Sequence, residues 1–121
     1  MIMTQRRLEA IAKRWQSALK LSDWEVIVKL TRAKNMTRQD SMGVCNHTLT
    51  KRIAYIEIMN PRDYTPDYLD HDIERTVVHE LLHCHFAPFE AKTGTPEDMA
   101  QEQTIHAIST TLVELDRSKR S

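Results

Sequence analysis

The sequence predicts a small α+β protein in which helices near both ends of the chain enclose a short β-sheet. Apolar residues recur at helical spacing near the N-terminus and again after residue 66. Two segments between them alternate apolar and polar residues, as half-buried strands do. A chain of 121 residues also fits one domain. We therefore expect a single domain over residues 1–121, with an N-terminal helix, a twisted sheet of about three strands and two further helices.

The N-terminal helix is expected over residues 4–20. Basic side chains surround an apolar stripe there, which is typical of a helix that packs one face against a core. The stripe consists of Leu8, Ile11, Ala12, Trp15, Ala18 and Leu19. A Ser-Asp pair at residues 22–23 interrupts the pattern, and residues 24–30 then alternate as a strand. Residues 31–42 are polar and are expected to form a loop.

A hairpin is expected next, with strands over residues 43–47 and 53–59. On the second strand Ala54, Ile56 and Ile58 fall on one face, so this face should lie on the core. An Asn-Pro pair at residues 60–61 ends the strand.

The most informative stretch is an H-E-x-x-H motif at residues 79–83, within a helix expected from near Asp67 to Phe86. Residues four apart lie one turn apart on one face of a helix, so His79 and His83 can direct imidazole nitrogens at one zinc ion. Glu80, one position after the first histidine, can reach a metal-bound water without binding the metal. The motif therefore predicts a zinc site with Glu80 as general base.

A catalytic zinc takes three protein ligands and leaves one position open. Thr95 and Pro96 are typical of a helix start. The apolar stripe of this helix is expected to consist of Met99, Ile105, Ile108, Leu112 and Leu115. Glu102 falls on the apolar stripe of this helix, so we expect it to point into the core. A buried carboxylate without a partner is costly, and a metal would remove that cost. Glu102 is therefore the expected third ligand.

His106 is the alternative third ligand, because it lies one turn after Glu102 on the same face. If Glu102 binds the metal, His106 should overhang the site and either orient a ligand or stabilise a developing oxyanion. Asp72 lies two turns before His79 on the ligand face and is a weaker candidate for contact with a ligand. His71 and His85 are expected to lie away from the metal.

The H-E-x-x-H motif followed by Glu102 on the next long helix resembles the gluzincin branch of zinc metallopeptidases. At this length the chain resembles minigluzincins and the small H-E-x-x-H proteins common in phage and prophage sequences. The resemblance implies a zincin-like fold with a helix, a small sheet, the motif helix and a glutamate-bearing helix. In that family an edge strand receives the substrate. The strand at residues 53–59 resembles it, although a plain sheet strand fits the pattern equally well.

Composition argues against several other classes of function. Seventeen basic and seventeen acidic residues balance, so neither nucleic acid nor a membrane surface is an expected partner. No apolar leader or long apolar run is present, and a cytoplasmic location is the expectation. The two cysteines, Cys45 and Cys84, do not suggest a disulfide framework, and Cys84 is expected to be a small buried residue.

The expected function is zinc-dependent hydrolysis of peptide bonds, with a peptide or protein as substrate. Zinc held by His79, His83 and Glu102 would activate a water, and Glu80 would take its proton. Two alternatives stay open. One is a non-proteolytic phage or prophage factor that keeps the zinc and binds a host protein. The other is a site closer to the SprT-like DNA-associated proteases, in which His106 is the third ligand.

Overall fold

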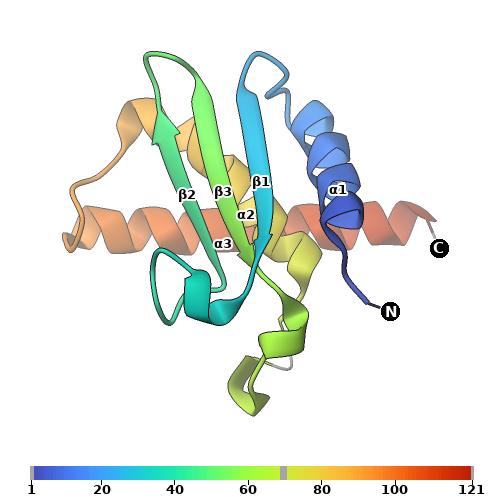
Figure 1. The fold of residues 1–121 in the computed structure, drawn as a ribbon. Coiled ribbons are helices and arrows are strands. Elements are labelled where there is room, and N and C mark those ends of the chain that lie inside the picture. The colour runs from blue at the N-terminus through green and yellow to red at the C-terminus, as the bar shows by residue number, and fades with distance from the viewer. Residues whose placement is uncertain (1, 69–70, 121) are drawn as a thin grey trace.

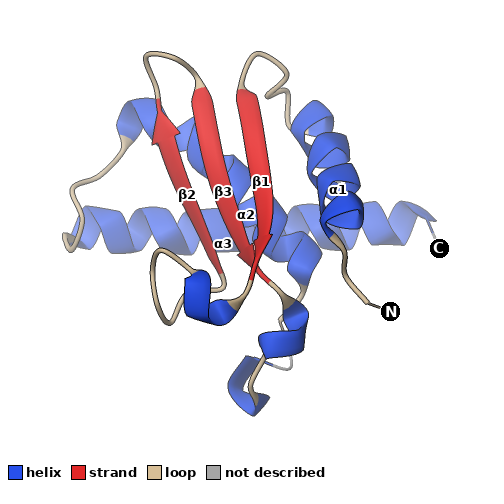
Figure 2. Ribbon diagram, viewed as in Figure 1, coloured by secondary structure: helices blue, strands red, loops and turns tan. Residues whose placement is uncertain are grey.

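The computed structural model describes residues 2–68 and 71–120, and it confirms a small α+β fold (Figures 1 and 2). Within these residues three helices and a three-stranded mixed sheet are formed. The elements are α1 (Gln5–Ala18), β1 (Glu25–Thr31), β2 (Gly43–Thr48), β3 (Ile53–Met59), α2 (Ile73–Phe86) and α3 (Pro96–Arg120). Short 3₁₀ turns occupy the loops. The first helix, the three strands and the hairpin lie within two residues of their expected bounds.

The sheet has the order β1-β3-β2, so β3 is its central strand. β1 pairs with β3 in parallel and β2 pairs with it antiparallel, and both Val28 and Cys45 lie opposite Ile56. This decides between the two readings of residues 53–59: β3 is a plain central strand, not an edge strand. The strand at the edge beside α2 and α3 is β2.

All three helices leave one face of the sheet uncovered, because α2 and α3 lie behind the other face and α1 packs beside β1 (Figure 1). As expected, Ala54, Ile56 and Ile58 are buried on the covered face. Residues Val77, Val78 and Leu81 of α2 and Leu8, Ala12 and Trp15 of α1 complete this core. One side of α2 is therefore fixed against the sheet, and the opposite side is turned toward α3.

The start of α2 differs from the expectation. The helix begins at Ile73 instead of near Asp67, and residues 66–68 form a 3₁₀ turn; the expected first turn also covers residues 69–70, which lie outside the described residues. Asp72 is the N-cap, and its carboxylate accepts hydrogen bonds from the amides of Glu74 and Arg75. It also pairs with Arg117. Asp72 therefore caps the helix and contacts no metal-ligand candidate.

Thr95 caps α3 as expected, with its hydroxyl accepting from the amide of Asp98 at 3.2 Å. The predicted apolar stripe is wrong at both ends, because Met99 is 65% exposed and Leu115 is 57% exposed. Burial in α3 is confined to its middle, at Ile105, Ser109 and Val113. Figure 1 gives the reason: α3 crosses behind the sheet and projects beyond it on both sides. No helix in the described part of the chain is apolar over a length that would cross a membrane.

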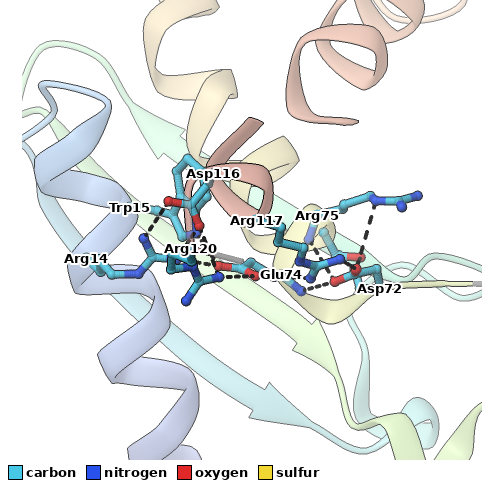
Figure 3. A network of polar contacts seen from close by, with 9 residues as sticks. Arg14, Trp15, Asp72, Glu74, Arg75, Asp116, Arg117 and Arg120 are labelled. Carbon is cyan, nitrogen blue, oxygen red and sulfur yellow. Dashed lines mark hydrogen bonds and ion pairs between the residues drawn. The ribbon is translucent and has the colours of Figure 1, made fainter. Parts of the chain in front are cut away.

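A network of charged residues joins the three helices near the start of α2 (Figure 3). Its centre is Glu74, whose side chain is only 12% exposed. The Glu74 carboxylate accepts from the Trp15 indole at 2.7 Å, from Arg14 at 2.6 Å and from Arg117 at 3.0 Å. These bonds fix α2 relative to α1 and the C-terminal half of α3, and so determine where the remainder of α2 meets α3.

Candidate metal centre

Three side chains with metal-binding groups meet between α2 and α3. Oε2 of Glu102 lies 3.1 Å from Nε2 of His79, and Oε1 of Glu102 lies 2.9 Å from Nε2 of His83. The three potential ligand atoms all lie within 4.8 Å of one another. The two histidines come from one face of α2, and Glu102 comes from the first half of α3. The structure thus brings together the two histidines of the motif and Glu102, the residue expected as third ligand.

The local sequence of α2 explains why both histidines face the cleft. Val77, Val78 and Leu81 are fully buried against the sheet, so the helix is fixed in rotation. His79 and His83, four residues apart, then share the side that faces α3, and both side chains are partly buried. Their rings lie 5.4 Å apart, centroid to centroid.

Glu102 occupies a different environment from the one expected. Its side chain is 47% exposed and faces the cleft, so the expectation that it points into the core is wrong. Its orientation follows instead from its contacts. Hydrogen bonds from His79 and His83 hold the pKa of the Glu102 carboxyl far below its usual range. Burial opposes protonation of His83, but the hydrogen bond to Glu102 and the charge of Glu80 outweigh it and raise the pKa of this imidazole.

This donor set fits a zinc ion. Two imidazole nitrogens and one carboxylate oxygen are the ligands of many catalytic zinc sites. With bonds of about 2.0–2.1 Å in a tetrahedron, ligand atoms lie roughly 3.3 Å apart. The carboxylate oxygens of Glu102 already lie 2.9 and 3.1 Å from the two ring nitrogens. The three ligand atoms lie within 4.8 Å of one another, so an ion between them requires only side-chain adjustment.

Glu80 lies beside this group and is the most buried carboxylate of the cleft, with 7% of its surface exposed. Burial raises the pKa of Glu80, and the nearby imidazoles of His79 and His83 lower it in part. A carboxylate with a raised pKa can both accept and return a proton near neutral pH. Its position, one residue after His79, is the one the motif predicts for a general base.

Gly43, the first residue of β2, packs directly against Glu80. A Cβ atom on Gly43 would lie 2.9 Å from Oε2 of Glu80 and 2.9 Å from the methyl carbon of Thr76, closer than Cβ atoms in proteins approach non-bonded atoms. The absence of a side chain therefore lets the edge strand approach the carboxylate. Sequence reasoning missed this role, although Gly43 is one of only two glycines in the chain and opens a strand.

The group faces a cleft of about 600 Å³ between β2, α2 and α3. His79, Glu80, His83, Glu102 and His106 all line it. His106 is exposed and lies outside the three-residue group that the described chain provides for a metal. Its role as an oxyanion donor or orienting group stays a prediction.

The remaining candidates lie around this centre. Cys84 is buried, as expected, and its thiol contacts that of Cys45 on β2 without forming a disulfide. The hydrogen bond with Cys84, together with burial, raises the pKa of Cys45. His85 faces away from the cleft, with Nε2 2.6 Å from the Leu19 carbonyl oxygen. His71 is exposed and lines the cleft, but it is not one of the three residues grouped there.

Comparison with known proteins adds no relative to this picture. The chain matches no protein-family model, no curated protein and no solved structure. What the centre can do therefore has to be argued from its own geometry and chemistry.

Proposed function

We propose that this protein is a zinc-dependent metallopeptidase of the gluzincin type, with a zincin-like fold. His79, His83 and Glu102 hold the metal, and Glu80 is the general base. The observation that carries the proposal is the convergence of Glu102 on both histidines of the H-E-x-x-H motif, from a separate helix. The same observation favours Glu102 over His106 as the third ligand, because His106 is outside the group.

A bound zinc would supply a Lewis acid and a water of lowered pKa. The chain's own residues supply the proton transfers. The carboxylate of Glu80 accepts a proton from the attacking water and then donates it to the leaving amine, which suits its raised pKa. His106, which lines the same cleft, is positioned to donate a hydrogen bond to the oxygen that becomes negative during attack.

The edge strand β2 is the element that binds the peptide in this proposal. β2 pairs with β3 alone within the described residues, so its other edge pairs with no strand there, and the Gly43 carbonyl at its start accepts from the Ser41 hydroxyl. Its residues Gly43, Cys45 and His47 line the cleft. An extended peptide can add to such an edge by main-chain hydrogen bonds. Binding of an extended peptide, which the resemblance implied for the strand at residues 53–59, is therefore assigned to β2 in this proposal.

Glu80→Gln tests the proposal, because glutamine keeps the size of glutamate and cannot accept the proton. We expect the variant to bind zinc with unchanged stoichiometry and to lose hydrolysis of an unfolded protein by ~10²–10⁴-fold. Exposed Glu97→Gln, in the first turn of α3, is the matched control and should cleave like wild type.

Equal cleavage by wild type and Glu80→Gln would mean that Glu80 is not the base. If neither cleaves a broad substrate panel while both bind zinc, the non-proteolytic alternative replaces this proposal. Chelator is added to parallel samples, so that activity that does not depend on metal is recognised.

A further inference from the structure

One arginine of the cleft, Arg38, forms no ion pair with another residue that the structure describes. Arg38 belongs to the loop between β1 and β2, which lies at the end of the sheet where β2 begins (Figure 1). Its side chain is exposed and lines the cleft. Among the described residues it forms no ion pair, and its one electrostatic interaction is with Glu80. By contrast, Arg75 in the same cleft lies 3.9 Å from the carboxylate of Asp72.

The loop holds Arg38 in place. The amide of Thr37 donates to the carboxylate of Glu57 on β3 at 2.9 Å, and Met36 is buried. On the other side, the Ser41 hydroxyl donates to the Gly43 carbonyl at 2.6 Å. The guanidinium of Arg38 is therefore presented to the cleft from an anchored segment, which reduces the conformational entropy lost when it binds a ligand.

The two ends of the cleft carry different charges. β2 starts with Gly43 against Glu80 and ends near His47, which lies 3.6 Å from Glu90. Arg38 and Arg75 both line the cleft. Arg38 lies in the loop that leads into Gly43, and Arg75 precedes Thr76, which packs against Gly43. Carboxylates also occur there, at Asp67 and Asp72, but Asp72 is bound by Arg117. The far end is lined by Glu90 and Asp98, which come from the connection after α2 and from the first turn of α3.

We propose that Arg38 binds a carboxylate of the peptide substrate, and so selects peptides with an acidic group on the side of the scissile bond that lies toward Gly43. This inference rests on the proposed peptidase function. A guanidinium recognises a carboxylate with two parallel hydrogen bonds, which gives direction as well as affinity. The carboxylate comes from an Asp or Glu side chain or from the peptide C-terminus, and both present the same group.

The test measures peptide binding as well as cleavage. Fluorescent peptides carry one Glu, moved stepwise along an otherwise neutral sequence, with matched Gln peptides and with free or amidated C-termini. Their dissociation constants are measured by anisotropy on zinc-loaded Glu80→Gln protein, in which hydrolysis does not interfere. We expect Glu at one position to bind about tenfold more tightly than Gln, the lower range for a charge-assisted hydrogen bond.

Adding Arg38→Gln should abolish this preference, and Arg38→Glu should favour a Lys peptide instead. Arg6→Gln is the matched control: Arg6 is an exposed residue of α1, and this variant should keep the preference. If the preference requires a free C-terminus and is lost on amidation, the carboxylate that Arg38 binds is the C-terminal one.

The inference is overturned if Glu and Gln peptides bind equally, if the preference survives in Arg38→Gln, or if no peptide binds. It is also overturned if Arg38→Gln slows cleavage of acidic and neutral peptides by one common factor, because Arg38 would then act through Glu80. The proposed function fails separately: peptides would bind with the acidic preference, but wild type would leave them intact.

Discussion

Two clusters of charged side chains join α2 to α3, and they differ in what they leave open to other molecules. In the network at the start of α2, Glu74 is almost buried and meets an indole and three guanidinium groups. At the candidate metal centre, Glu102 pairs, among the described residues, with the imidazoles of His79 and His83 alone and remains half-exposed to a cleft. The first cluster is complete within the chain, and the second is open to a ligand.

The choice of cation explains the difference. Arginine remains charged at every physiological pH, and in the network the hydrogen bond with Asp72 raises the pKa of Arg117 further. Imidazole titrates near neutral pH and in its neutral form binds transition metals. Carboxylates paired with guanidinium groups therefore act as fixed ties between helices, and a carboxylate paired with imidazoles can exchange its partner for a metal ion.

The largest expected effect is on zinc affinity at the open cluster, where it distinguishes a metal ligand from a neighbouring side chain. Glu102→Ala should weaken zinc binding by more than ~100-fold, because loss of even an outer contact of a ligand costs 10–100-fold. His106→Ala should cost less. Zinc affinities of both variants are measured by competition with a chromogenic chelator. If His106→Ala strips the metal and Glu102→Ala keeps it, the SprT-like alternative is correct.

At the closed cluster we expect a large effect on folding instead. Glu74→Ala should lower the free energy of unfolding by about 2–3 kcal/mol, because it leaves the part-buried Trp15 indole without an acceptor and leaves the arginines with only their aspartate partners. Glu102→Ala, measured with chelator present, should lower it by less than ~1 kcal/mol, as for an exposed ion pair. Urea unfolding of both variants checks this. Equal losses of the free energy of unfolding in the two variants would contradict the contrast between a structural tie at Glu74 and an open ligand site at Glu102.

A smaller effect is expected where β2 approaches Glu80. Gly43→Ala places a methyl group 2.9 Å from the carboxylate oxygen and from Thr76, so one of them must move. We expect about 1–3 kcal/mol of destabilisation, as for other overpacked sites, and a reduced kcat with KM nearly unchanged. The matched control is Gly94→Ala, because a Cβ there meets no atom within 4 Å. The φ of Gly94 is +84°, so alanine should lower the stability of this variant but leave its kcat unchanged.

The smallest expected effect is on pH dependence. The raised pKa of His83 stabilises the metal-free protein below the ordinary imidazole pKa, and this stabilisation is lost as pH rises through the raised value. The lowered pKa of Glu102 stabilises above the ordinary carboxyl pKa, and this contribution is lost only in strong acid. Between pH 6 and 8 the Tm with chelator should therefore fall more in wild type than in Glu102→Gln.

Zinc affinity should change in the opposite direction over the same interval, because the metal competes with protons for the imidazoles. Glu74→Gln provides the comparison for the closed cluster, since its arginine partners do not titrate in this range. An identical pH dependence of Tm in wild type and Glu102→Gln would contradict the assigned pairing.

Local patterns predicted the helices, the hairpin and the pair His79 and His83, because each depends on spacing along one element. Glu102 was selected correctly as a neighbour of the histidines, but on the expectation of a core position that the structure does not show. The order of the sheet was not predictable in this way, since alternation in residues 53–59 is the same for a central and an edge strand. The stripe of α3 was misleading for a related reason. Helical periodicity shows that Met99 and Leu115 share a side, but not that another element covers it.

The first turns of α3 are attached to the rest of the molecule by very few contacts. No residue from Pro96 to Thr104 is buried. Among the described residues, the side-chain links from these turns to preceding segments are Gln101 to the Phe89 carbonyl, Glu102 to the histidines, and Asp98 to the Gly94 amide just before the helix. A segment with so little buried surface opens locally at low free energy. Zinc bound through Glu102 would hold these turns closed. The hydrogen exchange of their amides would then slow when the metal binds and would measure metal occupancy.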